Sequence, residues 1–236
     1  MRRTVVIRTT IAALALLSGC FGTETGNPPF APGVAGGAGG TMGIVPVLQL
    51  DEGWLAIDDL TFLDACVAGS EGVVVRSEPG ALGLGSEPVL ETDPVLEEGE
   101  YCGVRAERVA WTSAAPSALR GYTLAIDASR PDGTPVRIRS TRTGTLELLG
   151  GAPFPMSPAS GGVLLFVTES LLFNGLAFDG VERELDGSIV VSAEKNAALL
   201  ERIEAQLPGA LALYRDADGD GRLSMEEERA GPLSGP

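Results

Sequence analysis

The chain contains no histidine. Serine and cysteine hydrolases that use a histidine base are therefore excluded, and so are zinc and haem sites with histidine ligands. No Walker-type phosphate loop occurs, and the glycine-rich stretches 36–40 and 80–85 do not have the spacing of a dinucleotide fingerprint. A hydrolase built on two carboxylates remains an alternative, because acidic residues are plentiful. We expect a protein that is not an enzyme.

Aromatic and basic residues are both scarce. Aromatic residues make up 5% of the chain, with two tryptophans, whereas carbohydrate sites usually present several exposed rings. Because Trp54 and Trp111 lie in strand-like runs, we expect both in the core. The 17 basic residues face 32 acidic ones, which gives a formal net charge of -15. This balance argues against nucleic acid as a partner and favours divalent cations near the surface.

Long apolar runs are also missing. The run over residues 11–17 is far shorter than the roughly 20 apolar residues that cross a bilayer. Arg2, Arg3 and Arg8 precede it, and small residues follow. A basic region, a short apolar region and small residues are typical of an export signal. We interpret residues 1–19 as a signal peptide.

The sequence Leu17-Ser18-Gly19-Cys20 resembles the lipobox of bacterial lipoproteins. The resemblance implies cleavage before Cys20, acylation of this cysteine and a lipid anchor in the cell envelope. Two or three acyl chains anchor a protein stably. Phe21 in place of aspartate favours the outer membrane, again by resemblance. The segment 23–28, Thr-Glu-Thr-Gly-Asn-Pro, is similar to the start of many uncharacterised bacterial lipoproteins. The alternative is an ordinary secretory signal with an incidental cysteine.

Three further segments follow the signal. Residues 20–43 are rich in glycine and proline and poor in large apolar residues, which predicts a flexible tether. Residues 44–192 form one β-domain. Residues 193–236 contain a helix and then an acidic loop.

The β-domain is predicted from short apolar runs separated by Gly, Pro, Asp and Ser. The runs cover residues 44–50, 54–62, 73–76, 101–111, 122–127, 136–149, 163–167 and 188–191. Strands of this number and length favour a β-sandwich of the immunoglobulin or transthyretin type. A closed barrel is the alternative.

Cys66 and Cys102 remain after Cys20. In an exported protein two such cysteines predict one disulfide, with free thiols as the alternative.

The sequence predicts one clear helix, over residues 193–207, directly after the β-domain. Ser192 is a suitable N-cap, and Pro208 with Gly209 would end the helix. Its apolar stripe, which we expect to dock on the β-domain, consists of Leu199, Leu200, Ile203 and Leu207.

Residues 216–227 resemble the calcium loop of an EF-hand, with carboxylates at positions 1, 3, 5 and 12 and glycine at position 6. The resemblance implies six ligand residues: Asp216, Asp218, Asp220, Arg222 through its carbonyl, Ser224 and Glu227 with both oxygens. Gly221 would permit the sharp turn. The entering segment 211–215 and the exiting helix 225–230 are short, and no second loop occurs. The alternative is an acidic surface turn.

Together these patterns predict a membrane-anchored exported lipoprotein that binds calcium through a single loop and serves as a non-catalytic surface or envelope module. A carbohydrate-binding or carbohydrate-active surface lipoprotein is the alternative. A calcium sensor is a third possibility, which the single loop with short flanking helices disfavours.

Overall fold

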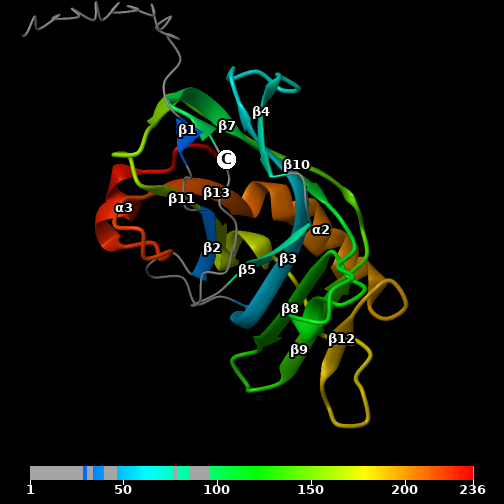
Figure 1. Ribbon diagram of the computed structural model, residues 1–236. Coiled ribbons are helices and arrows are strands. Elements are labelled where there is room, and N and C mark those ends of the chain that lie inside the picture. The colour runs from blue at the N-terminus through cyan, green and yellow to red at the C-terminus, as the bar shows by residue number, and fades with distance from the viewer. Residues whose placement is uncertain (1–28, 31–33, 40–46, 77–78, 85–95, 236) are drawn as a thin grey trace, which may run out of the picture.

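A computed structural model describes residues 29–30, 34–39, 47–76, 79–84 and 96–235. The fold is mainly β, as predicted, with two main sheets, one separate two-stranded pair and a small number of helices (Figure 1). The expected signal peptide and Cys20 lie outside the described residues. Within the described ranges, no helix has the length and apolar character needed to cross a membrane.

The strands lie where the apolar runs predicted them, with several additions. Their bounds are β1 Pro29–Phe30, β2 Val34–Gly39, β3 Gln49–Leu63, β4 Gly72–Arg76, β5 Gly80–Gly83, β6 Leu96–Glu97, β7 Gly99–Arg108, β8 Leu124–Ser129, β9 Pro135–Ser140, β10 Gly144–Met156, β11 Gly162–Thr168, β12 Ile189–Val191 and β13 Leu211–Asp216. The helices are α1 Glu169–Leu172, α2 Ala197–Ala210, α3 Met225–Ala230 and the 3-10 turn η1 Ser117–Leu119.

The larger sheet is built around β3. Its order is β10-β7-β3-β8-β9-β12, and β4 and β5 also pair with β3. All pairs are antiparallel except β12, which runs parallel to β9. Along β3, Leu55 and Ile57 are buried on the inner face. Trp54 and Ala56 alternate with them and therefore point to the outer face.

The second sheet has the order β13-β11-β2, with β13 antiparallel and β2 parallel to β11. Strand β2 corrects the sequence prediction, because residues 34–39 were assigned to the flexible tether. The small residues of this segment allow the close approach: a Cβ on Gly39 would lie 3.0 Å from the ring of Phe166. Backbone pairing along β11 thus replaces the apolar side chains that the segment lacks.

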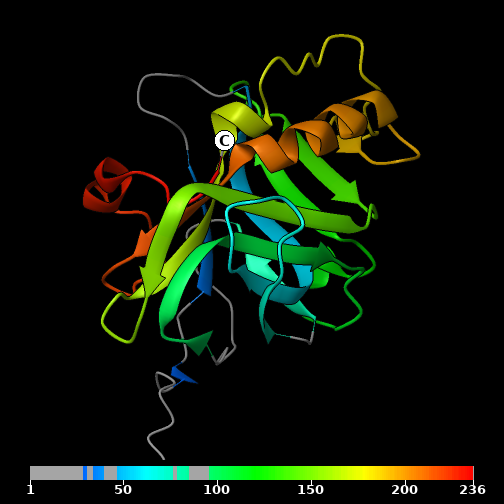
Figure 2. The same cartoon turned by 90° about the horizontal axis from the view of Figure 1, so that it is seen from above.

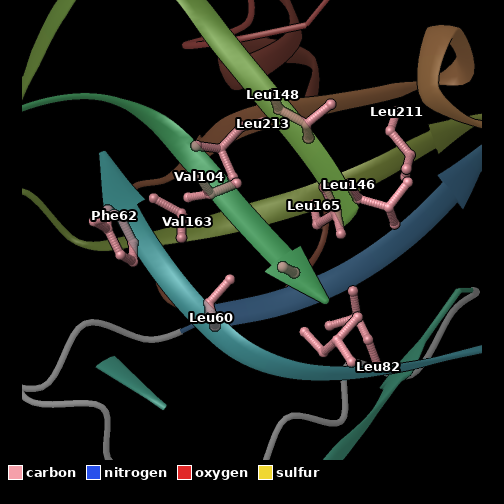
Figure 3. A pocket seen from close by; sticks show the side chains of 12 residues that line it. Leu60, Phe62, Leu82, Val104, Leu146, Leu148, Val163, Leu165, Leu211 and Leu213 are labelled. Carbon is pink, nitrogen blue, oxygen red and sulfur yellow. The ribbon is translucent and has the colours of Figure 1, made fainter. Parts of the chain in front are cut away.

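One main core lies between the two sheets. It contains side chains from both, and β10 contacts β13 while β2 contacts β5. Figure 3 shows apolar side chains of several strands around an interior void, among them Phe62, Leu82, Leu148, Leu165 and Leu213. The void has a volume of about 20 Å³, and all the side chains that line it are apolar. Such a small apolar void is expected to stay dry.

Helix α2 lies across one end of the sheets (Figure 2). Leu200, Ile203 and Leu207 are buried in the main core, which confirms the predicted docking stripe. The predicted bounds were wrong at both ends. Residues 193–196 are not helical, because the Ser192 hydroxyl accepts backbone N–H groups of Glu194 and Lys195 in a local turn.

The far end of α2 passes through Pro208 to Ala210. Proline removes one backbone hydrogen bond of the last turn. Burial of Leu207 and Ala210, at 0% and 1% exposure, holds that turn against the core despite the loss. The helix therefore delivers the chain directly into β13 without a break.

The disulfide prediction is confirmed. Cys66 and Cys102 are bonded, with their Cα atoms 4.8 Å apart. The bridge ties the turn after β3 to β7, two strands that are also neighbours in the sheet. Residues 130–133 form the turn between β8 and β9, in which Gly133 N–H donates to the Arg130 carbonyl at 2.8 Å.

Candidate metal centre

The acidic loop leaves the second sheet directly from β13. The sequence predicted a short entering helix over residues 211–215, and the structure places a strand there instead. Leu211, Ala212 and Leu213 are buried, and the strand pairs with β11 along its whole length up to Asp216 opposite Gly162. Pairing and burial together override any helical preference of this segment. The local arrangement is strand–loop–helix.

Asp216 organises the first half of the loop. Its side chain is buried, and Oδ1 accepts the N–H of Gly219 at 2.9 Å while Oδ2 accepts the N–H of Gly221 at 3.1 Å. Gly221 has a φ of 71°, which favours glycine and confirms its predicted place at a sharp turn. The chain therefore wraps around the Asp216 carboxylate.

Glu227 closes the second half of the loop. Its Oε1 accepts the N–H of Ala217 at 2.7 Å, and its Oε2 accepts the N–H of Ser224 at 2.8 Å. Ser224 in turn accepts the Glu227 N–H, so the pair forms a capping box at the start of α3. The predicted exiting helix is confirmed, and its first turn fixes Glu227 against the start of the loop.

Three of the predicted ligands converge. Oxygens of Asp216, Asp218 and Glu227 all lie within 4.8 Å of one another. Calcium–oxygen bonds are about 2.3–2.6 Å, so oxygens on opposite sides of one ion are about 5 Å apart. The cluster is therefore compact enough to hold one metal ion. Each carboxylate oxygen has two lone pairs and keeps one free beside its N–H bond.

The other predicted ligands are not part of this cluster. Asp220 is exposed, and its Oδ1 accepts the N–H of Arg222 at 2.8 Å. Ser224 Oγ serves the helix cap. Asp218, in contrast, belongs to the cluster, and its Oδ1 also stabilises the loop by accepting the Asp220 N–H at 3.2 Å.

In the part of the chain that the structure describes, the carboxylates of the cluster form no ion pair with a basic side chain. The pKa of Asp216 is raised, mainly because its carboxyl group is buried. The N–H groups of Gly221 and Gly219 act to lower this pKa, whereas the negative charges of Glu227 and Asp218 raise it. For Glu227, burial opposes ionisation, but the N–H groups of Ser224 and Ala217 bring its pKa below the usual value.

The chain after α3 returns to the sheets, a contact that no sequence signal indicated. Leu213 N–H donates to the Ser234 carbonyl at 2.7 Å, and Leu233 N–H donates to the Leu213 carbonyl at 2.7 Å. On the other side Gly235 N–H reaches the Leu149 carbonyl of β10 at 3.4 Å. We call residues 233–235 the C-terminal tail. It lies between β13 and β10, where the two sheets meet.

Comparisons with protein-family models, curated proteins and solved structures found no match to this chain.

Proposed function

We propose that residues 216–227 bind one calcium ion and that the ion holds the C-terminal tail in place between the two sheets. The observation that carries the proposal is the convergence of Asp216, Asp218 and Glu227, with which no basic side chain of the described residues forms an ion pair. Three acidic oxygens at this spacing suit a hard divalent cation. The C-terminal tail is hydrogen-bonded to β13, which enters the loop, and it follows α3, which leaves the loop. The conformation of the loop therefore sets the distance between β13 and α3, and with it the position of the tail.

The ligand roles follow from the positions in the loop. Asp216 and Asp218 would each supply a carboxylate oxygen, and Glu227 would close the site from the first turn of α3. Asp220, the Arg222 carbonyl and Ser224 are proposed to complete the shell, directly or through water. The backbone N–H groups that already hold Asp216 and Glu227 preorganise the loop, which lowers the ordering cost of binding.

Calcium should stabilise the folded protein against urea. With a dissociation constant of about 0.1–1 mM, as in extracellular modules, about 10 mM calcium would add roughly 1.4–2.7 kcal/mol to the free energy of unfolding. We expect this gain to disappear with chelator and in Glu227→Gln. Glu226→Gln is the matched control, because Glu226 carries the same charge one position earlier and is exposed outside the cluster. In calorimetric titration with calcium, wild type and Glu226→Gln should bind with similar affinity, and Glu227→Gln should bind much more weakly. An absence of both heat and stabilisation at millimolar calcium would remove the ion from the proposal.

We further propose that the protein is an exported lipoprotein anchored in the cell envelope, on the outer membrane, through Cys20. The support is the basic, apolar and small-residue order of residues 1–19 and the lipobox resemblance. We also propose a non-catalytic role, which the absence of histidine favours.

Lipidation has a direct test. Cells expressing the full chain should incorporate labelled palmitate into the protein, and Cys20→Ala should abolish the label. Cys66 and Cys102 are bonded to each other and so leave Cys20 as the acceptor. Label that persists in Cys20→Ala contradicts the anchor.

For the architecture we propose a sandwich of the immunoglobulin or transthyretin type in preference to a closed barrel. Both sheets contribute to one core, and β10 contacts β13 without strand pairing between the two. A closed barrel would continue the hydrogen-bonded ladder across that boundary.

A further inference from the structure

The sequence prediction placed both tryptophans in the core; the structure packs them, partly buried, against a second and smaller core cluster on the outer face of the large sheet. Trp54, Trp111 and Tyr122 pack against a small second cluster formed by Ala56, Leu119 and Ala125. The inner neighbours of these residues along β3 and β8 belong to the main core. We call the three rings the aromatic face. All three are half-buried.

Backbone pairing fixes the segments that carry the three residues. Trp54 lies opposite Ala125 in the β3–β8 pairing. In the connection from β7 to β8, Trp111 N–H donates to the Tyr122 carbonyl at 2.9 Å and Gly121 N–H donates to the Trp111 carbonyl at 2.8 Å. The two indole N–H groups are also fixed: Trp54 Nε1 donates to Glu52 at 2.6 Å and Trp111 Nε1 to the Ala115 carbonyl at 3.0 Å. The rings are thus held in place before any ligand arrives.

This use of aromatic residues is selective. The chain has only two tryptophans and three tyrosines, and both tryptophans and one tyrosine are on this face. The main core is filled chiefly by aliphatic residues and phenylalanine. Tryptophan and tyrosine suit sites where one side of the ring is packed and the other meets a polar ligand. The placement indicates a binding surface.

The size of the face limits its ligand. An aromatic side chain has roughly 150–250 Å² of surface, and each of these three is mostly buried, so together they expose at most on the order of 200 Å², against roughly 800 Å² per partner in a stable protein interface. A small ligand with flat apolar faces therefore fits better than a protein. Beside Trp54 on this face lie Glu52, which accepts the Trp54 indole N–H, and the ion pair of Asp127 with Arg139 on the adjoining strands. Hydroxyl groups can bond to both kinds of side chain.

We propose that the aromatic face binds a neutral saccharide, whose C–H faces stack on the indole rings and whose hydroxyls bond to the polar side chains beside them. The net charge of -15 disfavours anionic glycans. None of the residues of the face belongs to the loop 216–227, so this site is separate from the proposed calcium site.

The intrinsic fluorescence of the protein reports on this face, because both tryptophans belong to it. The full-length folded protein is titrated with neutral hexasaccharides of glucose, mannose and N-acetylglucosamine at millimolar concentration, with and without chelator. We expect at least one sugar to shift the tryptophan emission to shorter wavelength and to reduce quenching by acrylamide. The result should not depend on calcium.

Calorimetry with the best sugar then tests the residues. Trp111→Ala should weaken binding by about tenfold or more, as for a central aromatic contact. Trp111→Phe keeps a ring and should retain part of the affinity, which guards against loss through misfolding. Leu185→Ala is the control, since Leu185 is fully exposed and lies outside the face. No response to any of the sugars, or unchanged affinity in both Trp111 variants, would overturn the proposal.

Discussion

Replacing Glu204 by alanine should lower the free energy of unfolding by about 3–5 kcal/mol, because it leaves a buried guanidinium without its partner. Arg108 at the end of β7 and Glu204 on α2 form a two-point ion pair, with Nη1–Oε2 at 2.6 Å and Nη2–Oε1 at 2.9 Å. Their side chains are 5% and 1% exposed. Arg108 Nη2 also donates to Thr123, and Arg108 Nε has no acceptor.

Urea unfolding of purified variants measures this effect. Glu201→Ala, on the exposed side of the same helix, is the matched control and should change stability by less than about 0.5 kcal/mol. Replacing both members, as in Arg108→Met with Glu204→Leu, should recover most of the loss, since apolar pairs often replace buried ion pairs without cost. A loss below about 1 kcal/mol for Glu204→Ala would show that water reaches the pair.

The same pair predicts a pH dependence. Burial alone would raise the pKa of Glu204, but the hydrogen bonds from Arg108 and Ser140 and the nearby charges of Arg108 and Arg142 bring it below the usual value. A lowered folded-state pKa means that the contribution is complete above the unfolded pKa of about 4.3 and is lost as pH falls through the folded value. The difference in the free energy of unfolding between wild type and Glu204→Ala should therefore become smaller in strong acid, as urea unfolding at several pH values would show.

Removing the disulfide should cost roughly 4 kcal/mol on the chain-entropy model, because the bridge between Cys66 and Cys102 closes a loop with a sequence separation of 36. The double variant Cys66→Ser with Cys102→Ser is compared with wild type by thermal and urea unfolding. Its stability should be the same with and without reductant, whereas wild type should weaken in reductant. Equal stability of the two proteins under oxidising conditions would contradict the estimate.

Positions that a local pattern determines were predictable from the sequence. The alternating apolar runs place β7, β8, β9 and β11, because side chains on a strand with one buried face repeat with period two. The Ser224 and Glu227 spacing indicates the start of α3, since both groups of the capping box lie within one turn. The ligand cluster is equally local. Loop residues only a few positions apart can meet whatever the rest of the fold does.

Features that depend on distant partners were not predictable. Residues 34–39 have almost no large apolar side chains, and only the free edge of β11 makes them a strand. Leu211 to Asp216 follow a helix without a break, and pairing with the same strand decides their conformation. Both tryptophans lie in strands or strand-like segments, but an apolar run does not show which face meets the core when the outer face carries its own cluster. Glu204 gave no signal at all, because its partner Arg108 lies in another element.

Strand β11 has a consequence for the order of folding. Val34 on one side of it is opposite Val163, and Arg215 lies on the other side of Val163. The second sheet therefore joins segments from near both ends of the described chain and can be completed only after its last strand has been made. Contacts of such long sequence separation slow folding. All strands of the large sheet lie within residues 49–191, so this sheet needs neither β2 nor β13. It can form first and offer its inner face as the surface on which the second sheet assembles.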